Sequence, residues 1–404
     1  MNTSFLRGVL AGLMVSGVPA LAAAQPPPEA PPGERPTYTL GPVTVRPRLL
    51  LNNMGVDDNV FNETDDPKSD WTFGAQPDVE FSLRPGRARL VWLSGAEFVY
   101  YRRYDSERSI NRSQTLSAEY DLNVLRPFAT YGTSHTSARP NAEIDVRARR
   151  HPYAYSFGSA VKMASRLTGT ALVRKTREEY DEGTAFREQE LAETLNHRGT
   201  IYEGSMTFQA TPITSLSIVV AHETLTFDES PLRDSRSIRV APTVTFSPFG
   251  LLNGTASVGM KKFEGDSAAM PGYTGLVMNG TLSTLVLDRF RIDTRFARDV
   301  HYSYEEALPF YVLTGARATL AAQLTDRFDV RLTGGHDRMT YRPFAGEPDP
   351  GADTMNLYGG GVGFYIGERT RLVLQAEFTG RASARDRTRE FSNRRIFATV
   401  TWGV

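Results

Sequence analysis

Apolar and polar residues alternate one by one through much of this chain, and this pattern restricts the possible folds more than any other feature. Between Trp71 and Leu83 the odd positions carry Trp, Phe, Ala, Pro, Val, Phe and Leu, while the even positions are small, polar or charged. The same period of two recurs in residues 238–246, 290–296 and 396–404. Because successive side chains of a strand point to opposite faces, each segment predicts a β-strand between an apolar and a polar environment.

Short turns alternate with longer polar connections along the chain. Eight short turns are expected at residues 84–87, 123–126, 165–166, 211–214, 247–250, 285–288, 325–326 and 367–368. Longer polar connections lie between them, for example at residues 137–150, 180–197, 342–353 and 383–389. Short turns on one side and long loops on the other are typical of an outer-membrane β-barrel, with the turns in the periplasm.

The turns allow a count of the strands. Eight turns join sixteen strands, and an opening strand at residues 43–53 and a closing strand at residues 394–404 raise the number to about eighteen. Sixteen is also possible, because residues 104–123 alternate weakly. We therefore expect an all-β, antiparallel, up-and-down transmembrane barrel over residues 43–404. A soluble β-sandwich, propeller or solenoid is the alternative, and it would have to accommodate the many charges of the polar face.

The N-terminus has the features of an export signal. Arg7 precedes an apolar stretch at residues 9–18, and Ala22, Ala23 and Ala24 fit a cleavage site, so residues 1–24 predict a signal peptide with Gln25 as the first mature residue. Residues 25–42 contain seven prolines and predict a periplasmic linker. An N-terminal membrane anchor is the alternative, but the apolar stretch is short for a span.

Composition excludes several classes of function. The chain has no cysteine, which excludes disulfides, thiolate catalysis and cysteine-bound zinc. Its 46 basic and 46 acidic residues balance, so no nucleic-acid partner is expected. No apolar run after residue 24 is long enough for a transmembrane helix. These observations favour an exported protein of the bacterial outer membrane, in contact with lipid and lipopolysaccharide.

Aromatic residues fall near the predicted strand ends, where the interfacial belts of a barrel lie. They include Tyr100, Tyr101, Tyr153, Tyr155, Tyr302, Tyr311, Tyr341, Phe364, Tyr365 and Trp402. The chain ends in Trp402-Gly403-Val404, which is similar to the aromatic-ended strand read by the barrel-assembly machinery, although the last residue is Val. The barrel-assembly machinery is therefore an expected partner.

The opening strand ends in Asp57-Asp58-Asn59-Val60-Phe61. This ending resembles the start of an outer-membrane β-barrel porin family that includes barrels encoded with exopolysaccharide-export systems. The resemblance implies an outer-membrane barrel whose cargo is undefined. Asp57, Asp58 and Asn59 have oxygen ligands for a cation at the outer rim, but Asp and Asn also cap turns through bonds to the backbone.

The alternation predicts which residues face inward, and these residues indicate a charged lumen. An acidic wall would carry Asp78, Glu80, Glu97, Glu119 and Asp121. A basic wall would carry Lys162, Arg174, Arg239, Lys261, Arg291, Arg295 and Arg317. Opposed walls of this kind would orient polar solutes in a transverse field; the alternative is a mixture of charges that only solvates the lumen. Residues 137–150 and 180–197 either fold inward to narrow the pore or stay outside.

No pattern of bond chemistry stands out. The six histidines form no zinc-binding motif, and the chain has no nucleophile elbow or phosphate loop. His336 and Asp337 are adjacent on a predicted strand and point to opposite faces, so they cannot form a dyad. We expect the protein to have no enzymatic activity and to bind no cofactor or metal. The predicted function is passive passage of small polar solutes. The alternatives are a barrel for exopolysaccharide export, and a structural or adhesive barrel closed by its loops. The oligomeric state stays open.

Overall fold

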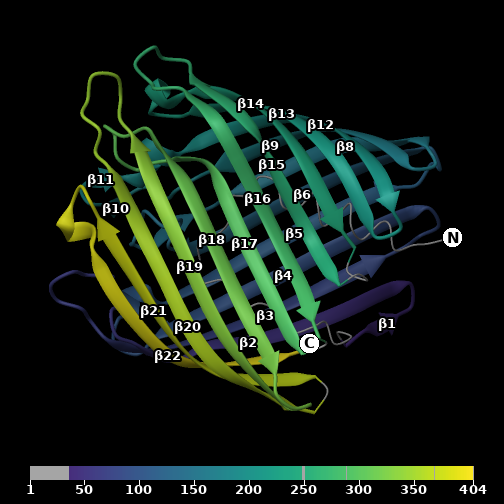
Figure 1. The fold of residues 1–404 in the computed structure, drawn as a ribbon, viewed down its shortest axis with the longest axis horizontal. Helices are drawn as coiled ribbons and strands as arrows, with labels where there is room; N and C mark the ends of the chain where they lie inside the picture. Colours follow the sequence, from purple (N-terminus) through teal and green to yellow (C-terminus); the bar gives the residue numbers. More distant parts are fainter. Residues whose placement is uncertain (1–35, 248–250, 288, 368, 404) are drawn as a thin grey trace.

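The barrel strands follow one another around a closed ring in the computed structural model, which describes residues 36–247, 251–287, 289–367 and 369–403 (Figure 1). Eighteen antiparallel strands form the ring, and pairing of the first with the last, β2 with β22, closes it. The strands are β2 (Val43–Asp57), β3 (Asp70–Leu83), β4 (Ala88–Tyr101), β5 (Ser109–Tyr120), β6 (Leu125–Ala138), β8 (Tyr153–Ala164), β9 (Leu167–Glu178), β12 (His197–Thr211), β13 (Thr214–Phe227), β14 (Ser235–Phe246), β15 (Leu252–Gly265), β16 (Tyr273–Val286), β17 (Phe290–Tyr302), β18 (Phe310–Gln323), β19 (Phe328–Arg342), β20 (Ala352–Ile366), β21 (Thr370–Ser383) and β22 (Phe391–Trp402).

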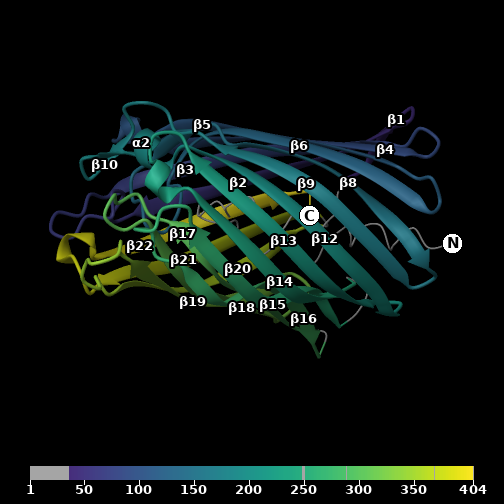
Figure 2. The same cartoon turned by 90° about the horizontal axis from the view of Figure 1, so that it is seen from above.

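Short elements decorate the two ends of the barrel. They are β1 (Tyr38–Leu40), β7 (Ala148–Arg150), β10 (Ala185–Phe186), β11 (Gln189–Glu190), the helix α2 (Leu191–Leu195) and the 3-10 helices η1 (Asp105–Glu107), η2 (Pro231–Arg233) and η3 (Arg387–Arg389). Figure 2 shows α2 and β10 at the end with the long loops and β1 at the other end. The long-loop end is the extracellular, outer end, and the short turns face the periplasm.

The predicted fold is confirmed, and the sixteen-strand alternative is wrong because β5 is a complete member of the ring. The opening strand extends to Asp57, four residues beyond the expected end, and the closing strand begins at Phe391. The expected turn at residues 123–126 is displaced, since β6 already begins at Leu125. The predicted signal peptide and residues 25–35 lie outside the described residues. The last part of the predicted linker forms β1, which pairs with the start of β2.

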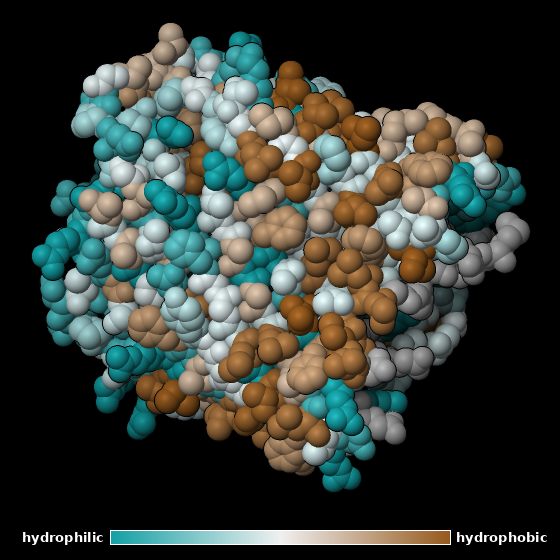
Figure 3. All heavy atoms as spheres, viewed as in Figure 1, coloured by the Kyte–Doolittle hydropathy of each residue, from teal (hydrophilic) through white to brown (hydrophobic). Residues whose placement is uncertain are grey.

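The two faces of the wall differ in polarity as the alternation predicts. Outward side chains such as Trp71, Trp92 and Leu116 are exposed. In Figure 3 apolar side chains gather in a broad band across the strands, while hydrophilic ones dominate the long-loop end at the left. In a bilayer this band would face lipid, and strand pairing around the ring satisfies the backbone. Within the described residues, no helix has both the length and the apolar character needed to cross a membrane.

The outer ends of β17 and β18 bend inward, away from the barrel wall. The ladder between β16 and β17 stops at Met278 and Arg298, whereas β17 and β18 pair onward to Tyr302 and Phe310. Beyond that point outward-facing positions of β17 and β18 are buried against inward-facing residues of the neighbouring wall; Phe310 is fully buried and packs edge-on against Phe263 at 5.0 Å. The outer tip of the β17–β18 hairpin therefore lies inside the barrel.

This tip changes the outcome for the aromatic residues. Tyr100 and Tyr153 are exposed on the outer face, as expected for an interfacial belt. Tyr311 and Tyr341 are each only 1% exposed, and they lie in the lumen-side core with Met339. Their ring centroids are 5.4 Å apart, with the ring planes tilted by 50°. Their assignment to the belt is therefore wrong. Tyr311 has the inward parity of Arg317 on β18, and Tyr341 has the inward parity of Arg331 on β19.

Candidate functional site

The predicted acidic wall lies on β3, β4 and β5, and most of its carboxylates have an arginine beside them. Arg48 and Arg46 of β2 donate to Asp78 and Glu80 at 2.7 Å each. The remaining contacts are Arg89 to Glu119 at 3.6 Å, Arg126 to Asp121 at 3.6 Å, and Asn111 Nδ2 to Glu97 at 2.8 Å. Asp121 lies just past the end of β5. Charge on this side is thus balanced locally rather than concentrated.

The predicted basic wall is also partly paired. Arg239 lies 3.6 Å from Glu203, Arg291 lies 3.0 Å from Asp293, and Lys261 contacts both Asp299 and Glu223, at 3.1 and 3.6 Å. Lys162 and Arg174 lie on β8 and β9, away from Arg295 and Arg317 on β17 and β18. The sequence analysis does not predict the charged partners of these walls. Alternation could have found them, because they have the inward parity of their own strands. They are Arg46, Arg48, Arg89, Glu203, Glu223 and Asp299.

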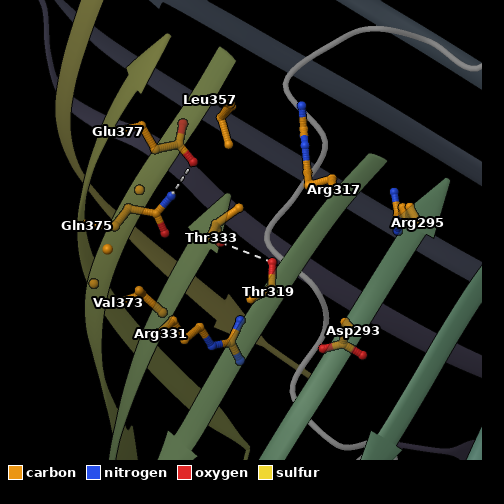
Figure 4. Close-up of a pocket in the computed structure, with 13 residues that line it drawn as sticks. Asp293, Arg295, Arg317, Thr319, Arg331, Thr333, Leu357, Val373, Gln375 and Glu377 are labelled. Carbon is orange, nitrogen blue, oxygen red and sulfur yellow. Dashed lines mark hydrogen bonds between the residues drawn. The ribbon is translucent and has the colours of Figure 1, made fainter. Parts of the chain in front are cut away.

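A recess of about 80 Å³ opens in the inner wall over β17 to β21. Its lining includes Asp293, Arg295, Arg317, Thr319, Arg331, Thr333, Gln375 and Glu377, together with Gly359 and Gly361. Figure 4 shows Arg295 and Arg317 on one side of it and Gln375 and Glu377 on the other. Three arginines stand against one aspartate and one glutamate in this lining, which leaves a net charge of +1.

The outer mouth is crossed by the loop at residues 139–147, which joins β6 to β8. Its Glu143 is fully buried and accepts a hydrogen bond of 2.7 Å from Ser303 Oγ, beyond the end of β17. On the far wall, Arg381 of β21 donates to the backbone oxygens of Ala142 and Glu143, at 3.3 Å each. Since β6 and β21 lie on well-separated arcs of the ring, this loop spans the lumen.

A buried ionic cluster anchors the crossing loop to the far wall. Asp353 is fully buried and receives hydrogen bonds from Arg381 Nη2 at 2.6 Å, Arg389 Nε at 3.0 Å and Ser383 Oγ at 2.6 Å. Arg389 also donates to the Tyr304 hydroxyl and to Glu305, both at 2.9 Å. Arg381, which holds the loop, is thus fixed by a carboxylate of β20, and the same carboxylate binds Arg389.

Further loops meet across the outer mouth. Arg187, in the connection between β9 and β12, pairs with Asp386 at 2.6 Å on the connection between β21 and β22. Below it Ile144, Leu191, Ala192, Leu195 and Tyr304 form a buried apolar cluster. Burial raises the pKa of the Glu143 carboxyl, and burial lowers the pKa of Arg233, which donates to the Glu305 backbone oxygen, to about 10. Residues 137–150 and 180–197 therefore fold inward, which is the first of the two alternatives for these loops.

Residues 31–403 match the family model described as Putative beta-barrel porin 2. The chain belongs to this family. It is a β-barrel porin of the bacterial outer membrane, which confirms the family indicated by the opening strand and the predicted location.

The porin has the fold of solved outer-membrane porins at low sequence identity. OccK2 (OpdF) of Pseudomonas aeruginosa matches with a TM-score of 0.51 and 10% identity, over 89% of this chain and 97% of that one. A BenF-like porin from Pseudomonas fluorescens Pf-5 matches with a TM-score of 0.50 and 9% identity, over 89% and 99%. No curated protein matches the sequence. At these identities the likeness establishes the fold alone.

In the porin, the Asp57–Phe61 motif closes the outer end of the seam between β2 and β22. The Asp57 carboxylate accepts from Asn393 Nδ2 at 2.7 Å and from the Asn59 backbone at 3.0 Å. Asn59 Nδ2 donates to the Ser392 backbone oxygen at 2.9 Å, and Val60 is buried. These bonds are the expected turn chemistry, and a cation bound by Asp57, Asp58 and Asn59 stays a prediction. Among the described residues, no group of three or more His, Asp or Glu side chains is arranged to hold a metal.

The histidines of the porin, which all lie within the described residues, form no catalytic pair with Asp337. The rings of His135 and His151 lie 4.2 Å apart, away from His301 and His336. His336 Nδ1 is 2.8 Å from Asn356 Oδ1, while Asp337 folds over Gly315 in the neighbouring strand. His301 stacks on Tyr311 at 5.7 Å inside the barrel, and His336 is paired in register with Ala316, farther down β18. His336 and Asp337 thus have separate partners, and His301 does not join them.

Proposed function

We propose that this porin allows passive passage of small polar solutes across the outer membrane and prefers anions. One observation carries the proposal: the inner face of an eighteen-strand ring is lined with charged and hydroxyl side chains. Barrels of this size have room for an aqueous channel. The anion preference rests on the recess over β17 to β21, where arginines outnumber carboxylates. Opposed acidic and basic walls contribute less, because many of their charges are paired locally. The proposal involves no bond chemistry, cofactor or metal.

The loops that cross the outer mouth set a condition on this function. We expect solutes to pass only while the loop at residues 139–147 and the tip of the β17–β18 hairpin are displaced from the lumen. We therefore expect a pore that is mostly closed and opens in discrete events, rather than one that is permanently open. Loops that detach while the ladders stay paired would open it without unfolding the barrel, since local opening costs less than global unfolding.

The test is single-channel recording of the refolded protein in a planar bilayer under a salt gradient. We expect rare openings of large unit conductance, with a reversal potential on the anion side. Heat-modifiable migration in a gel provides the control that the recorded protein is folded. A folded protein that never conducts, even after its outer loops are detached, would contradict passage.

The closed mouth also favours a second candidate, a structural or adhesive barrel whose lumen stays shut. The recording separates the two, because a structural barrel should remain silent when the loops are released. Exopolysaccharide as the cargo rests on the family resemblance of Asp57–Phe61. Polysaccharide-synthesis genes beside the coding gene would favour that cargo, and their absence would count against it.

Export and assembly complete the proposal. Signal peptidase removes residues 1–24, and the strand ending in Trp402 is read by the barrel-assembly machinery. Mass spectrometry of the protein from outer membranes should give a mature chain that begins at Gln25. A chain that begins at Met1 and remains in the inner membrane would contradict this export route.

A further inference from the structure

Two like charges face each other across the ladder between β17 and β18. Arg295 and Arg317 are directly opposite in register, so their Cβ atoms lie about 5 Å apart. Like charges in this position destabilise a sheet unless a counter-charge lies near them. Within the described chain Arg317 makes no hydrogen bond and no ion pair within 4 Å, although it attracts the Asp337 carboxylate, whose side chain lies over Gly315. The wall thus keeps at least one guanidinium available on the lumen side.

Glycines hollow the wall beside this pair. Gly359 and Gly361 occupy inward positions of β20, in register with Glu377 and Gln375 of β21. A Cβ atom at Gly359 would lie 3.1 Å from Glu377 Cγ, and one at Gly361 would lie 2.8 Å from Gln375 Cβ. The glycines therefore let these two side chains settle at the rim of the recess. Gln375 Nε2 donates to Glu377 Oε1 at 3.2 Å, which fixes both groups.

The lining has two chemically different ends. Arg295 and Arg317 bring guanidinium groups to one end, and their planar geometry suits a carboxylate or another oxyanion. Arg331 also lies at this end, where it donates to Asp329 at 3.3 Å. Thr319 and Thr333 lie between the ends with their hydroxyl oxygens 3.0 Å apart. At the far rim Glu377 accepts hydrogen bonds from hydroxyl groups and repels a second anionic group. The net charge of +1 matches a single negative charge.

We infer that this recess is a binding site for a small hydroxylated monocarboxylate, with its carboxylate at Arg295 and Arg317 and its hydroxyls toward Gln375 and Glu377. The inference rests on the proposed function, because it names the class of solute that the pore would favour. Binding here would hold the solute against one wall between the periplasmic opening and the crossing loop.

The experiment measures binding without passage, by ligand-observed saturation-transfer NMR of the folded full-length protein in detergent micelles. Glycerate is the probe, propionate is the same three-carbon acid without hydroxyls, and inorganic phosphate is the dianionic comparison. We expect glycerate to bind more tightly than either. Arg317→Gln should weaken glycerate binding at least tenfold, since a charge-assisted pair is lost. Lys162→Gln, a cation of the opposite wall, should change it less than twofold.

A second variant keeps the guanidiniums and fills the hollow. Gly359→Val should also abolish glycerate binding, while heat-modifiable migration shows that the barrel has folded. Equal binding by wild type and Arg317→Gln would overturn the site. Tighter binding of phosphate, or equal binding of propionate, would overturn the assigned class. Glycerate binding without any conductance would support the binding site and contradict passage of solutes. Conductance without glycerate binding would support passage and contradict the binding site.

Discussion

Asp353→Ala is expected to open the outer mouth of the barrel. The carboxylate is fully buried and holds Arg381 and Arg389, so its loss leaves two guanidiniums in the interior without their main counter-charge. Removing one partner of a buried ion pair costs about 3–5 kcal/mol. The strand ladders do not depend on Asp353, and the least costly relaxation is for the loop at residues 139–147 to detach. The open population should then rise by roughly 10²- to 10³-fold.

Trypsin and conductance both report this opening. Arg147 lies in the crossing loop, where it contacts Glu107 at 3.0 Å, and it is followed by Ala148. We expect the wild type to resist cleavage after Arg147 and Asp353→Ala to be cut there, with a matching rise in open probability. Glu264→Ala is the control, because its ion pairs lie at the surface, where such pairs contribute little. A variant that stays both trypsin-resistant and silent would contradict the assignment of Asp353 as the anchor.

The fold could be predicted because its signals are local. Alternation in residues 71–83 and the recurring short turns each depend on a few neighbouring residues. Contact with lipid outside the ring favours apolar side chains on the outward face of every strand. The weakly alternating β5 shows the limit of the pattern. Its membership in the ring is decided by pairing with β4 and β6, which residues 109–120 alone do not reveal.

The site could be predicted only in part, because its decisive contacts join distant segments. Glu143 reads as an ordinary loop carboxylate, yet its partner Ser303 lies 160 residues away. The inward parity of Arg295 and Arg317 followed from alternation, but their direct opposition depends on the register between β17 and β18. The belt assignment of Tyr311 and Tyr341 is wrong because it follows from their position near strand ends, although both have the inward parity of their strands.

Reversal of Arg295 and Arg317 together should convert the open pore from anion to cation preference. Two Arg→Glu changes move the charge of the recess lining from +1 to −3, in a lumen where many other charges are paired locally. The anion-to-cation permeability ratio should fall by about tenfold, because potentials of several kT act on ions near such a wall. The pair is introduced into Asp353→Ala, so that selectivity is read in an open pore.

Matched surface changes and salt distinguish a lumen effect from a change in net charge. Arg338→Glu with Arg394→Glu alters the net charge of the protein equally, but both residues are exposed on the outer face of the wall. This control should keep the anion preference. The shift caused by Arg295 and Arg317 should shrink at 1 M salt, where the Debye length is about 3 Å, compared with 0.1 M, where it is about 10 Å. An unchanged reversal potential at low salt would show that permeating ions do not pass this wall.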